Sequence, residues 1–412
     1  MKKPSNLRKS AGLVAALLLT LSWFSPMQQT LRTMPDTLAL TQGQLSALQL
    51  GGLTLQGDAL TATAQEDQTL SDVTTDASAT SDMLLTLLGI PLKKVEITIS
   101  PEKRLIPGGM ALGVAMRTEG VLIVGVSDVA DGISPARTAG LRAGDVIRTV
   151  DGQSVATAQA LTDLLEQAGA GPVMVAYDRQ GEARTALLQP HRDPTTGAVR
   201  LGAWVRDSTA GVGTLSFFDP DTGKYAALGH AITDGDTGSV LSVSQGQVLD
   251  ARIVDVQKGQ RGAPGELKGS FLREAHVLGD IRRNCILGVY GSLHQPPVNP
   301  LYPEGLPIGL RSGVHTGAAS ILSTVDGSGV KEYAIEITRV NQQTSPAPKS
   351  MVIRVTDERL LAATGGIVQG MSGSPILQDG RLIGAVTHVF VSDPTQGYGL
   401  YVDWMLGEAG LI

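Results

Sequence analysis

Glycine is the feature that most constrains this chain, because 50 of its 412 residues are glycine while only 4% are aromatic. Glycine weakens helices and supplies the backbone of tight turns, so many short strands are favoured over long helices. Beyond residue 190, apolar runs at 213–218, 334–337 and 381–386 alternate with Gly, Pro and Asp turns such as Asp379-Gly380. We therefore expect residues 191–412 to form an all-β barrel or double barrel.

The segment 95–190 carries a different pattern. We expect strands at 95–99 and 121–126, an amphipathic helix at 157–168 and a hairpin turn at Asp151-Gly152. The intervening motifs are, in chain order, Ser134-Pro135-Ala136, Ala139-Gly140-Leu141, Ala143-Gly144-Asp145-Val146-Ile147 and Val150-Asp151-Gly152. This order resembles a PDZ domain of the bacterial protease-associated type. The resemblance implies a loop whose N–H groups bind a peptide carboxylate. The matching residues are Leu112, Gly113 and Val114.

The N-terminus has the pattern of an export signal. Lys2, Lys3, Arg8 and Lys9 precede an apolar run from Ala11 to Phe24, which is short for a spanning helix. We expect residues 1–28 to be a signal peptide or an uncleaved signal anchor that tethers the chain to a membrane. Residues 29–94 are expected to be a variable region, with a polar linker at 57–82.

Charge and cysteine content exclude several classes of protein. The net charge of -6 is scattered, without the basic stripe that nucleic-acid binding requires. The single cysteine, Cys285, forms no intramolecular disulfide and matches no cysteine-protease signature. No histidine pair has metal-ligand spacing, so we expect neither a metal nor a cofactor.

The segment that best fits a catalytic site is Gly370-Met371-Ser372-Gly373-Ser374-Pro375. A serine hydroxyl needs a neighbouring base and donors for the developing oxyanion. Glycines around Ser372 permit a turn whose Gly370 and Ser372 amides form an oxyanion hole. The segment resembles the nucleophile segment of chymotrypsin-like peptidases. Met371 stands where trypsin-type enzymes have an acid, so activation by a new N-terminus is not expected.

The base is expected to be His230, which follows an apolar stretch at a glycine turn, 142 residues before Ser372. His388 competes with it and is interpreted as a pocket-lining or structural residue. The third member of a triad is a carboxylate that orients the imidazole. The sequence leaves four candidates open: Asp234, Asp236, Asp255 and Asp357.

Four segments carry a resemblance to a known family. They are Leu228-Gly229-His230-Ala231-Ile232-Thr233-Asp234, the run from Thr364 to Pro375, the run from Gly384 to Val391, and the run from Asp393 to Gly399. Together they resemble the stage IV sporulation protein B peptidases of endospore-forming bacteria, over about residues 95–412. The resemblance implies a triad of His230, Asp357 and Ser372, and self-cleavage near the N-terminus. It also implies export from the forespore and action in the intermembrane space. The implied substrate is a membrane-bound regulatory protein of an intramembrane protease complex.

The expected protein is thus a PDZ domain at 95–190 followed by a chymotrypsin-like serine peptidase at 191–412. Two other functions are compatible with the sequence: a non-catalytic exported PDZ scaffold, and a quality-control protease of the high-temperature-requirement type. The second type places its PDZ domains after the peptidase, whereas here the PDZ-like segment comes first. Substitution of Ser372 by alanine separates an enzyme from a scaffold.

Overall fold

The computed structural model describes residues 31, 34–41, 43–44, 53–56, 79–100, 102–130, 132–271 and 276–412. The chain divides into two compact units, Met1–Lys103 with Pro307–Val314, and Arg104–Leu306 with His315–Ile412. The expected signal segment 1–28 lies outside the described residues, as does the expected linker up to residue 78. Within the described ranges, no helix has the length and apolar character needed to cross a membrane.

The first unit contains a four-stranded sheet in the order β1-β4-β3-β2. Its strands are β1 (Thr37–Thr41), β2 (Thr54–Gln56), β3 (Ala79–Leu87) and β4 (Ile90–Ser100). β1 and β4 are parallel and the other neighbours antiparallel. The 3₁₀ turn η1 (Arg311–Gly313) joins this unit, where the Ser312 hydroxyl accepts a hydrogen bond from the Ala39 amide at 2.9 Å. Alternate residues of β4, Val95, Ile97 and Ile99, are buried in its core.

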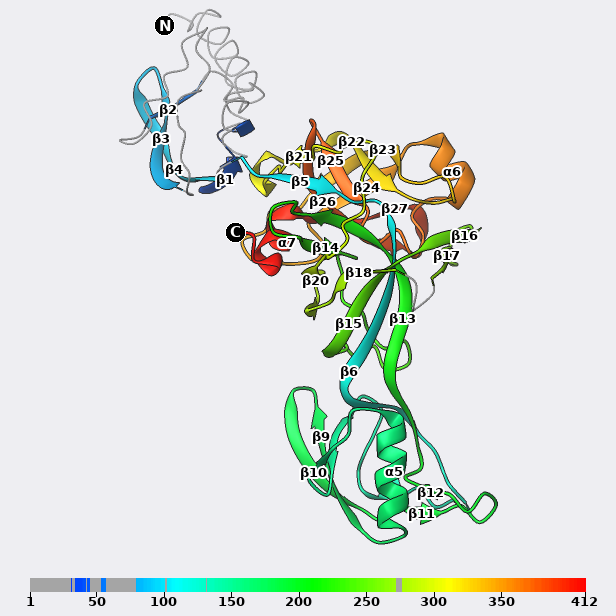
Figure 1. Ribbon diagram of the computed structural model, residues 1–412. Coiled ribbons are helices and arrows are strands. Elements are labelled where there is room, and N and C mark those ends of the chain that lie inside the picture. The colour runs from blue at the N-terminus through cyan, green and yellow to red at the C-terminus, as the bar shows by residue number, and fades with distance from the viewer. Residues whose placement is uncertain are drawn as a thin grey trace, which may run out of the picture. The chain divides into compact units, whose positions relative to one another are not determined.

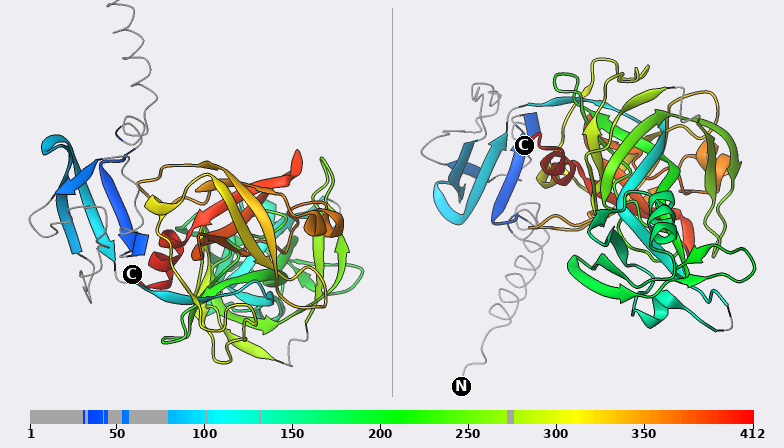
Figure 2. Two further views of the ribbon diagram at one scale, coloured as in Figure 1. Left: turned by 90° about the horizontal axis from the view of Figure 1, so that it is seen from above. Right: turned by 60° about the horizontal axis from the view of Figure 1, so that its bottom comes forward.

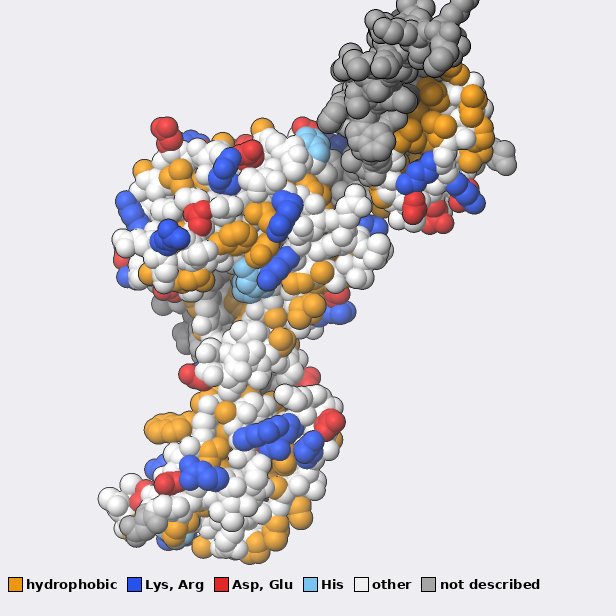
Figure 3. Space-filling view, turned by 180° about the vertical axis from the view of Figure 1, so that it is seen from behind, with side chains coloured by type: hydrophobic (Ala, Val, Ile, Leu, Met, Phe, Trp, Pro, Cys, Tyr) orange, Lys and Arg blue, Asp and Glu red, His pale blue; other side chains and the backbone are white. Residues whose placement is uncertain are grey.

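Hydrophobic side chains also gather on one face of the first unit (Figure 3). Around the β3–β4 turn, large apolar residues remain exposed: Leu84 (43%), Leu88 (94%), Ile90 (64%) and Leu92 (43%). The region thus has the alternation of a half-buried sheet, which is why residues 79–94 form strands where the sequence indicated a linker and a variable region.

In the second unit, β6 (Ala111–Val126) and β13 (Ala203–Phe218) are two 16-residue strands that run side by side (Figure 1). One half of each strand belongs to the PDZ region. That region also contains α4 (Pro135–Thr138), β7 (Val146–Val150), β8 (Gln153–Ser154), α5 (Ala158–Ala168), β9 (Val173–Arg179), β10 (Glu182–Leu188), β11 (His191–Arg192) and β12 (Val199–Arg200). Its sheet order is β10-β9-β7-β6-β13, and Leu161 and Leu165 of α5 pack into its core.

The helix and the hairpin turn predicted for this region are confirmed. Thr157 caps α5, accepting a hydrogen bond from the Ala160 amide at 3.0 Å. Asp151 and Gly152 have φ angles of 48° and 77° and join β7 to β8, as expected of a two-residue hairpin.

The other halves of β6 and β13 belong to the peptidase region. Further strands of the same sheet system are β5 (Arg104–Pro107), β14 (Lys224–Ala227), β15 (Val243–Asp250), β18 (Val277–Asp280), β19 (Arg283–Cys285), β20 (Gly288–Ser292) and β21 (Leu306–Pro307). β16 (Arg252–Gln257) and β17 (Glu266–Ser270) form a separate hairpin. Buried Leu112, Val114, Leu215 and Tyr225 lie in one core cluster of this region.

The C-terminal part of the peptidase region is a closed six-stranded barrel, coloured yellow to red in Figure 2. Its strands, in barrel order, are β22 (Gly317–Ser323), β23 (Lys331–Val340), β24 (Met351–Val355), β27 (Asp393–Tyr401), β26 (Arg381–Phe390) and β25 (Pro375–Gln378). Asp379 and Gly380, with φ angles of 51° and 71°, turn β25 into β26. Helices α6 (Glu358–Thr364) and α7 (Val402–Ala409) precede β25 and follow β27.

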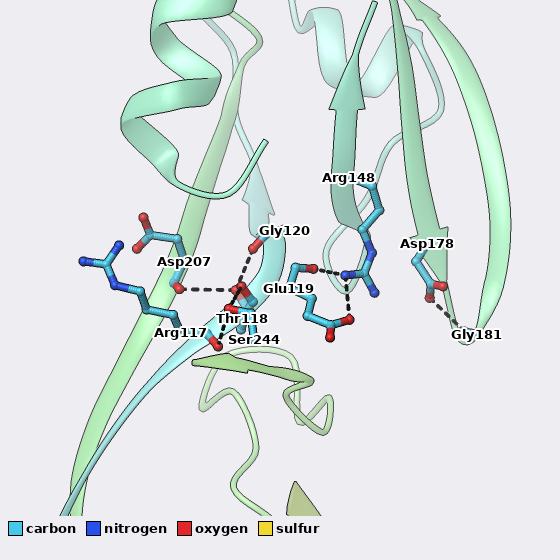
Figure 4. Close-up of polar contacts among 9 residues, drawn as sticks. All are labelled: Arg117, Thr118, Glu119, Gly120, Arg148, Asp178, Gly181, Asp207 and Ser244. Atoms are coloured by element: carbon cyan, nitrogen blue, oxygen red, sulfur yellow. Dashed lines mark hydrogen bonds and ion pairs between the residues drawn. The ribbon is translucent and has the colours of Figure 1, made fainter. Parts of the chain in front are cut away.

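The two regions meet where β6 bulges. Residues 118–121 of β6 lie between its pairings with Arg206 and Ser208 of β13. The Thr118 hydroxyl donates to the Gly120 carbonyl at 2.6 Å and lies 3.3 Å from the Asp207 carbonyl, as Figure 4 shows. Gly120 has a φ of +93°, which the bulge requires. A bulge bends its strand, so one continuous strand serves both regions.

The expected fold class is confirmed: the chain is mainly β, with a PDZ domain and a barrel-containing peptidase domain. The arrangement along the chain differs from the expected one at two places. The strand at 95–99 is β4 of the first unit, because it pairs with β1 and β3. Strand β5 and the first half of β6 already belong to the peptidase sheet. Along the chain, the PDZ region is therefore inserted between two strands of that sheet, β6 and β13.

Candidate active site

Ser372 lies in the loop that joins α6 to β25, and contacts with two other segments hold this loop. The Gly373 amide donates to the Val386 carbonyl at 2.8 Å, and the Thr214 amide donates to the Ser372 carbonyl at 3.1 Å. A Cβ on Gly373, whose φ is +97°, would lie 2.1 Å from the Thr214 carbonyl oxygen. Only glycine fits there. The sequence therefore places Ser372 at a fixed point between β13 and β26.

The Ser372 hydroxyl donates a hydrogen bond to the Thr387 carbonyl oxygen at 2.6 Å. Thr387 follows the residue that holds Gly373, so a single stretch of β26 positions both the backbone and the side chain of the loop. Ser372 itself is half-buried. In this arrangement the hydroxyl oxygen keeps its acceptor capacity, while its proton is directed at the main chain.

Two amides of this loop have no hydrogen-bond acceptor. Gly370 and Ser372 donate to no acceptor in the part of the chain that the structure describes, whereas the amides of Gln369, Met371, Gly373 and Ser374 all donate to backbone carbonyls. Gly370 has a φ of +95°, and a Cβ there would lie 2.9 Å from Leu267 Cβ. The loop thus offers two free donors beside the serine, which is the chemistry an oxyanion needs.

His230 follows β14 in a turn that contacts the same part of β26. Leu228 and Gly229 both have left-handed backbone, with φ angles of 71° and 66°. A Cβ on Gly229 would lie 3.0 Å from Thr387 Cγ2. Since the hydroxyl of Ser372 bonds to Thr387, the turn that carries His230 and the loop that carries Ser372 meet at this residue.

The environment of His230 suits a base. Its Nδ1 lies 2.8 Å from the carbonyl oxygen of Ala231, which requires the proton on Nδ1 and leaves Nε2 as acceptor. Burial lowers the pKa of His230, and the Ala231 carbonyl partly opposes this shift. The imidazole is therefore neutral at neutral pH.

His388 lies beside His230, with ring centroids 5.1 Å apart and planes tilted by 40°. A register shift between Val386 and Val389 of β26 places Thr387 and His388 in a bulge. Bulges near active sites commonly redirect a side chain. Partial burial of the ring is the main reason that the pKa of His388 is lowered, and electrostatic repulsion from His230 and Lys349 lowers it further. The interpretation of His388 as a pocket residue agrees with its place in a cavity wall.

Asp357 does not meet His230 in this structure. It caps α6, and its carboxylate accepts hydrogen bonds from the Arg359 amide at 2.9 Å and the Ala334 amide at 3.2 Å. An ion pair with the Arg359 guanidinium, 2.7 Å away, is the main reason that its pKa falls to about 2. Among the described residues, no hydrogen bond joins the two side chains, so the triad implied by resemblance lacks its third contact.

The other three carboxylates are also engaged elsewhere. Asp234 accepts hydrogen bonds from the amide of Thr237 at 2.9 Å and pairs with Arg206, which also binds Asp236 at 2.8 Å. Asp255 pairs with Lys268 at 3.1 Å. No carboxylate in the described ranges has a hydrogen bond to His230, and the Ala231 carbonyl is its orienting group.

The expected PDZ carboxylate loop at Leu112, Gly113 and Val114 is wrong. These residues lie inside β6, which pairs with β13 on one side and β15 on the other. Leu112 and Val114 are buried, and a Cβ on Gly113 would lie 2.6 Å from the ring of Phe271. Paired amides in the middle of a sheet cannot converge on a carboxylate. The glycines at 108 and 109 indicated a loop, but it ends before this strand.

Sequence reasoning missed a hollow of about 380 Å³ in the PDZ region. It lies between α5, which contributes Leu161 and Leu165, and residues 198–205. The available signal was Leu201-Gly202-Ala203, an apolar-Gly-apolar segment whose glycine has a φ of +74°. This hollow, and not the middle of β6, is the candidate peptide groove of the PDZ domain.

Comparison with known proteins matches two parts of the chain to families. Residues 197–406 match the model of the SpoIVB peptidase S55 family, and residues 125–179 match that of the PDZ domain. A search of curated proteins found no match. Among solved structures, the PDZ domain of the SdrC-like protein from Listeria monocytogenes is 24% identical over 21% of this chain and 87% of its own, with a TM-score of 0.19.

The Rv3671c protease from M. tuberculosis is also similar. Its active form is 16% identical over 49% of this chain and 74% of its own, with a TM-score of 0.26. Its inactive form is 17% identical over 49% of this chain and 84% of its own, with a TM-score of 0.25. The family match covers half of the chain, and the chain accordingly belongs to the SpoIVB peptidase S55 family as a serine endopeptidase with a PDZ domain.

Proposed function

We propose that Ser372 is the nucleophile and His230 the general base of this peptidase. The observation that carries the proposal is that the loop of Ser372 and the turn of His230 meet at Thr387, on the bulge of β26: the Ser372 hydroxyl bonds to Thr387, and Gly229, which precedes His230, packs against it. On substrate binding, the Ser372 hydroxyl turns from the Thr387 carbonyl to Nε2 of His230, the nitrogen that the Ala231 carbonyl leaves free. Its oxygen then attacks the peptide carbonyl carbon.

The remaining steps use groups of the same loop. The amides of Gly370 and Ser372 stabilise the oxyanion that forms on the carbonyl oxygen. The C–N bond breaks as His230 returns the proton to the leaving amine, and water then hydrolyses the acyl-enzyme. Asp357 has no part in this scheme, because its carboxylate is engaged with Arg359 and the cap of α6.

We infer the biological role from membership of the family. The chain is exported and tethered by residues 1–28, and it cleaves itself near its N-terminus. It then cleaves a membrane-bound regulatory protein of an intramembrane protease complex, in the space between the forespore and mother-cell membranes. That cleavage leads to processing of a sigma-factor precursor. Family membership supports this role, and the basic and apolar N-terminal segment supports export.

The test compares the full chain with its Ser372→Ala variant in a sporulating host. Mass spectrometry of the N-termini is expected to find a shortened form in the parent and only the signal-processed or full-length form in the variant. Purified parent is also expected to cleave β-casein, while the variant does not. Identical N-termini and identical casein digests would leave a non-catalytic scaffold as the better interpretation. If casein is cleaved but no sporulation regulator is processed, the proposed peptidase activity stands and the proposed role in sporulation is rejected.

A further inference from the structure

An apolar hollow beside His230 is a cavity of about 600 Å³, a size typical of ligand pockets. Its apolar wall comes from β6, β13, the turn after β14 and two loops: Val114, Val212, Leu228, Ile232, Val240 and Ile286. No Asp, Glu, Lys or Arg of the described residues is among its lining side chains. Because the lining is apolar and uncharged, the cavity favours binding of an apolar side chain over a charged one.

The cavity adjoins the proposed catalytic groups. His230 and His388 both line it, and burial keeps both imidazoles neutral near neutral pH. Leu228, another lining residue, packs against the nucleophile loop, because a Cβ on Gly373 would lie 2.5 Å from its amide nitrogen. A peptide whose carbonyl carbon reaches Ser372 therefore passes the mouth of this cavity.

The rim of the cavity contains apolar surface that folding leaves uncovered. Ile286 is 58% exposed and Val240 is 48% exposed, although both are large and β-branched. Neither belongs to a strand, since Ile286 lies in the turn between β19 and β20, and Val240 precedes β15. Exposed apolar residues around an apolar hollow mark a surface that a ligand covers.

From these observations we propose that the cavity is a specificity subsite. It takes one large apolar side chain (Leu, Ile, Met or Phe) from the substrate, at a position within two residues of the scissile bond. This inference rests on the proposed roles of Ser372 and His230. It adds the substrate class: peptide segments with an apolar residue next to the cleaved bond.

The first part of the test maps the bonds that the full-length enzyme cleaves in denatured β-casein, using the Ser372→Ala variant as background. One position within two residues of the cleaved bonds is expected to be enriched in large apolar residues. Two peptides are then made from a mapped sequence, one with Leu and one with Asp at that position. The Leu peptide is expected to be cleaved with at least about tenfold higher kcat/KM, the scale of discrimination by an apolar pocket.

The second part changes the rim. In Ile286→Lys, the preference is expected to narrow or reverse toward the Asp peptide, because a cation now stands at the mouth. Val298→Lys is the matched control: Val298 is 79% exposed and lies outside the cavity lining, so its Leu/Asp ratio stays that of the parent. Equal cleavage of both peptides by the parent, or an unchanged ratio in Ile286→Lys, overturns the subsite while leaving the peptidase intact. Casein digestion that persists in Ser372→Ala would instead reject the proposed nucleophile.

Discussion

At the scale of single residues, main-chain carbonyls hold both catalytic candidates. Ser372 donates to Thr387 and the Nδ1 of His230 bonds to Ala231, at 2.6 Å and 2.8 Å. A carbonyl carries no net charge, so it orients an imidazole while raising its pKa less than a carboxylate would. Burial is then the larger effect on His230, and its pKa falls below the usual value.

The pH dependence of cleavage follows from this shift. A base acts when deprotonated, and a lowered pKa keeps His230 deprotonated further into the acid range. We expect kcat/KM for a casein-derived peptide to fall on acidification with a midpoint below about 6.5, the usual value for histidine. In a peptidase whose histidine pairs with a carboxylate, the pKa of the histidine is higher. On acidification, such a peptidase would therefore lose its activity with a midpoint at higher pH. A measured midpoint above that value would show that a carboxylate does reach His230 in the active enzyme.

A second prediction at this scale concerns the glycine beside the nucleophile. Gly373→Ala places a methyl group where the Thr214 oxygen is 2.1 Å away, so the loop has to move and cleavage is expected to fall at least about 100-fold, as misplacement of a catalytic group does. Gly380→Ala is the control, because Gly380 also has positive φ (+71°) but has open space around it. It is expected to cost about 1 kcal/mol of stability and to leave kcat unchanged. Equal loss of activity in both variants would contradict the account of the loop.

At the scale of elements, α6 precedes the nucleophile loop, and Asp357 is the N-cap residue of this helix. Removal of an N-cap side chain costs about 1 kcal/mol of folding free energy. We expect Asp357→Ala to lower the free energy of unfolding by about that amount at neutral pH, while the pH midpoint of cleavage stays that of the parent. Urea unfolding and peptide kinetics measure the two quantities. A shift in that midpoint, or a loss of cleavage in a folded Asp357→Asn variant, would restore Asp357 to a triad.

The same carboxylate gives a stability difference that depends on pH. Its folded pKa of about 2 lies below its ordinary value near 3.9, so the charged form contributes stability above that ordinary value. The contribution is lost as pH falls through this interval toward 2. Accordingly, the stability difference between parent and Asp357→Asn is expected to be largest at neutral pH and to shrink toward about pH 2. A constant difference down to that pH would assign the effect to packing.

Elements set by local sequence were predictable. Helix α5, with Thr157 as its cap, and the Asp-Gly turns at 151–152 and 379–380 follow from residues within a few positions. Long-range pairing was not predictable. Residues 111–118 form a central strand because β13 and β15 flank them and Phe271 covers Gly113, contacts made by residues about 100 or more positions away.

The candidate site divides in the same way. Ser372, its glycines and His230 are visible as motifs, because the tight turns that they occupy need those residue types. The partner of the imidazole is not visible, since the sequence left four aspartates open and the structure joins His230 to a backbone carbonyl instead. Backbone partners such as the Thr387 carbonyl leave no side-chain signature in a sequence.

At the scale of the whole second unit, β6 and β13 connect the PDZ region to the proposed subsite. Val114 and Val212 line the cavity, and the same two strands continue past the bulge at Thr118 into the PDZ sheet. The Asp207 carboxylate accepts a hydrogen bond from the Ala158 amide at 2.9 Å, which ties the N-terminus of α5 to β13. Ser244 of β15 donates to the Thr118 carbonyl at 3.0 Å on the peptidase side. Hydrogen bonds at one bulge thus join both regions.

A substitution at this bulge tests whether the regions behave as one cooperative unit. Thr118 is buried, and Thr118→Val keeps its shape but removes the hydroxyl that serves the Gly120 and Asp207 carbonyls. Leaving buried acceptors unpaired costs about 1–3 kcal/mol. We expect hydrogen exchange to quicken both at β6 and at the first turns of α5, because Asp207 links them.

Thr162→Val, which removes only a hydroxyl bond within the exposed face of α5, is the control and leaves β6 unchanged. If Thr118→Val quickens exchange in β6 alone, α5 does not depend on the bulge, and peptide binding in the PDZ groove has no route through it to the cavity wall.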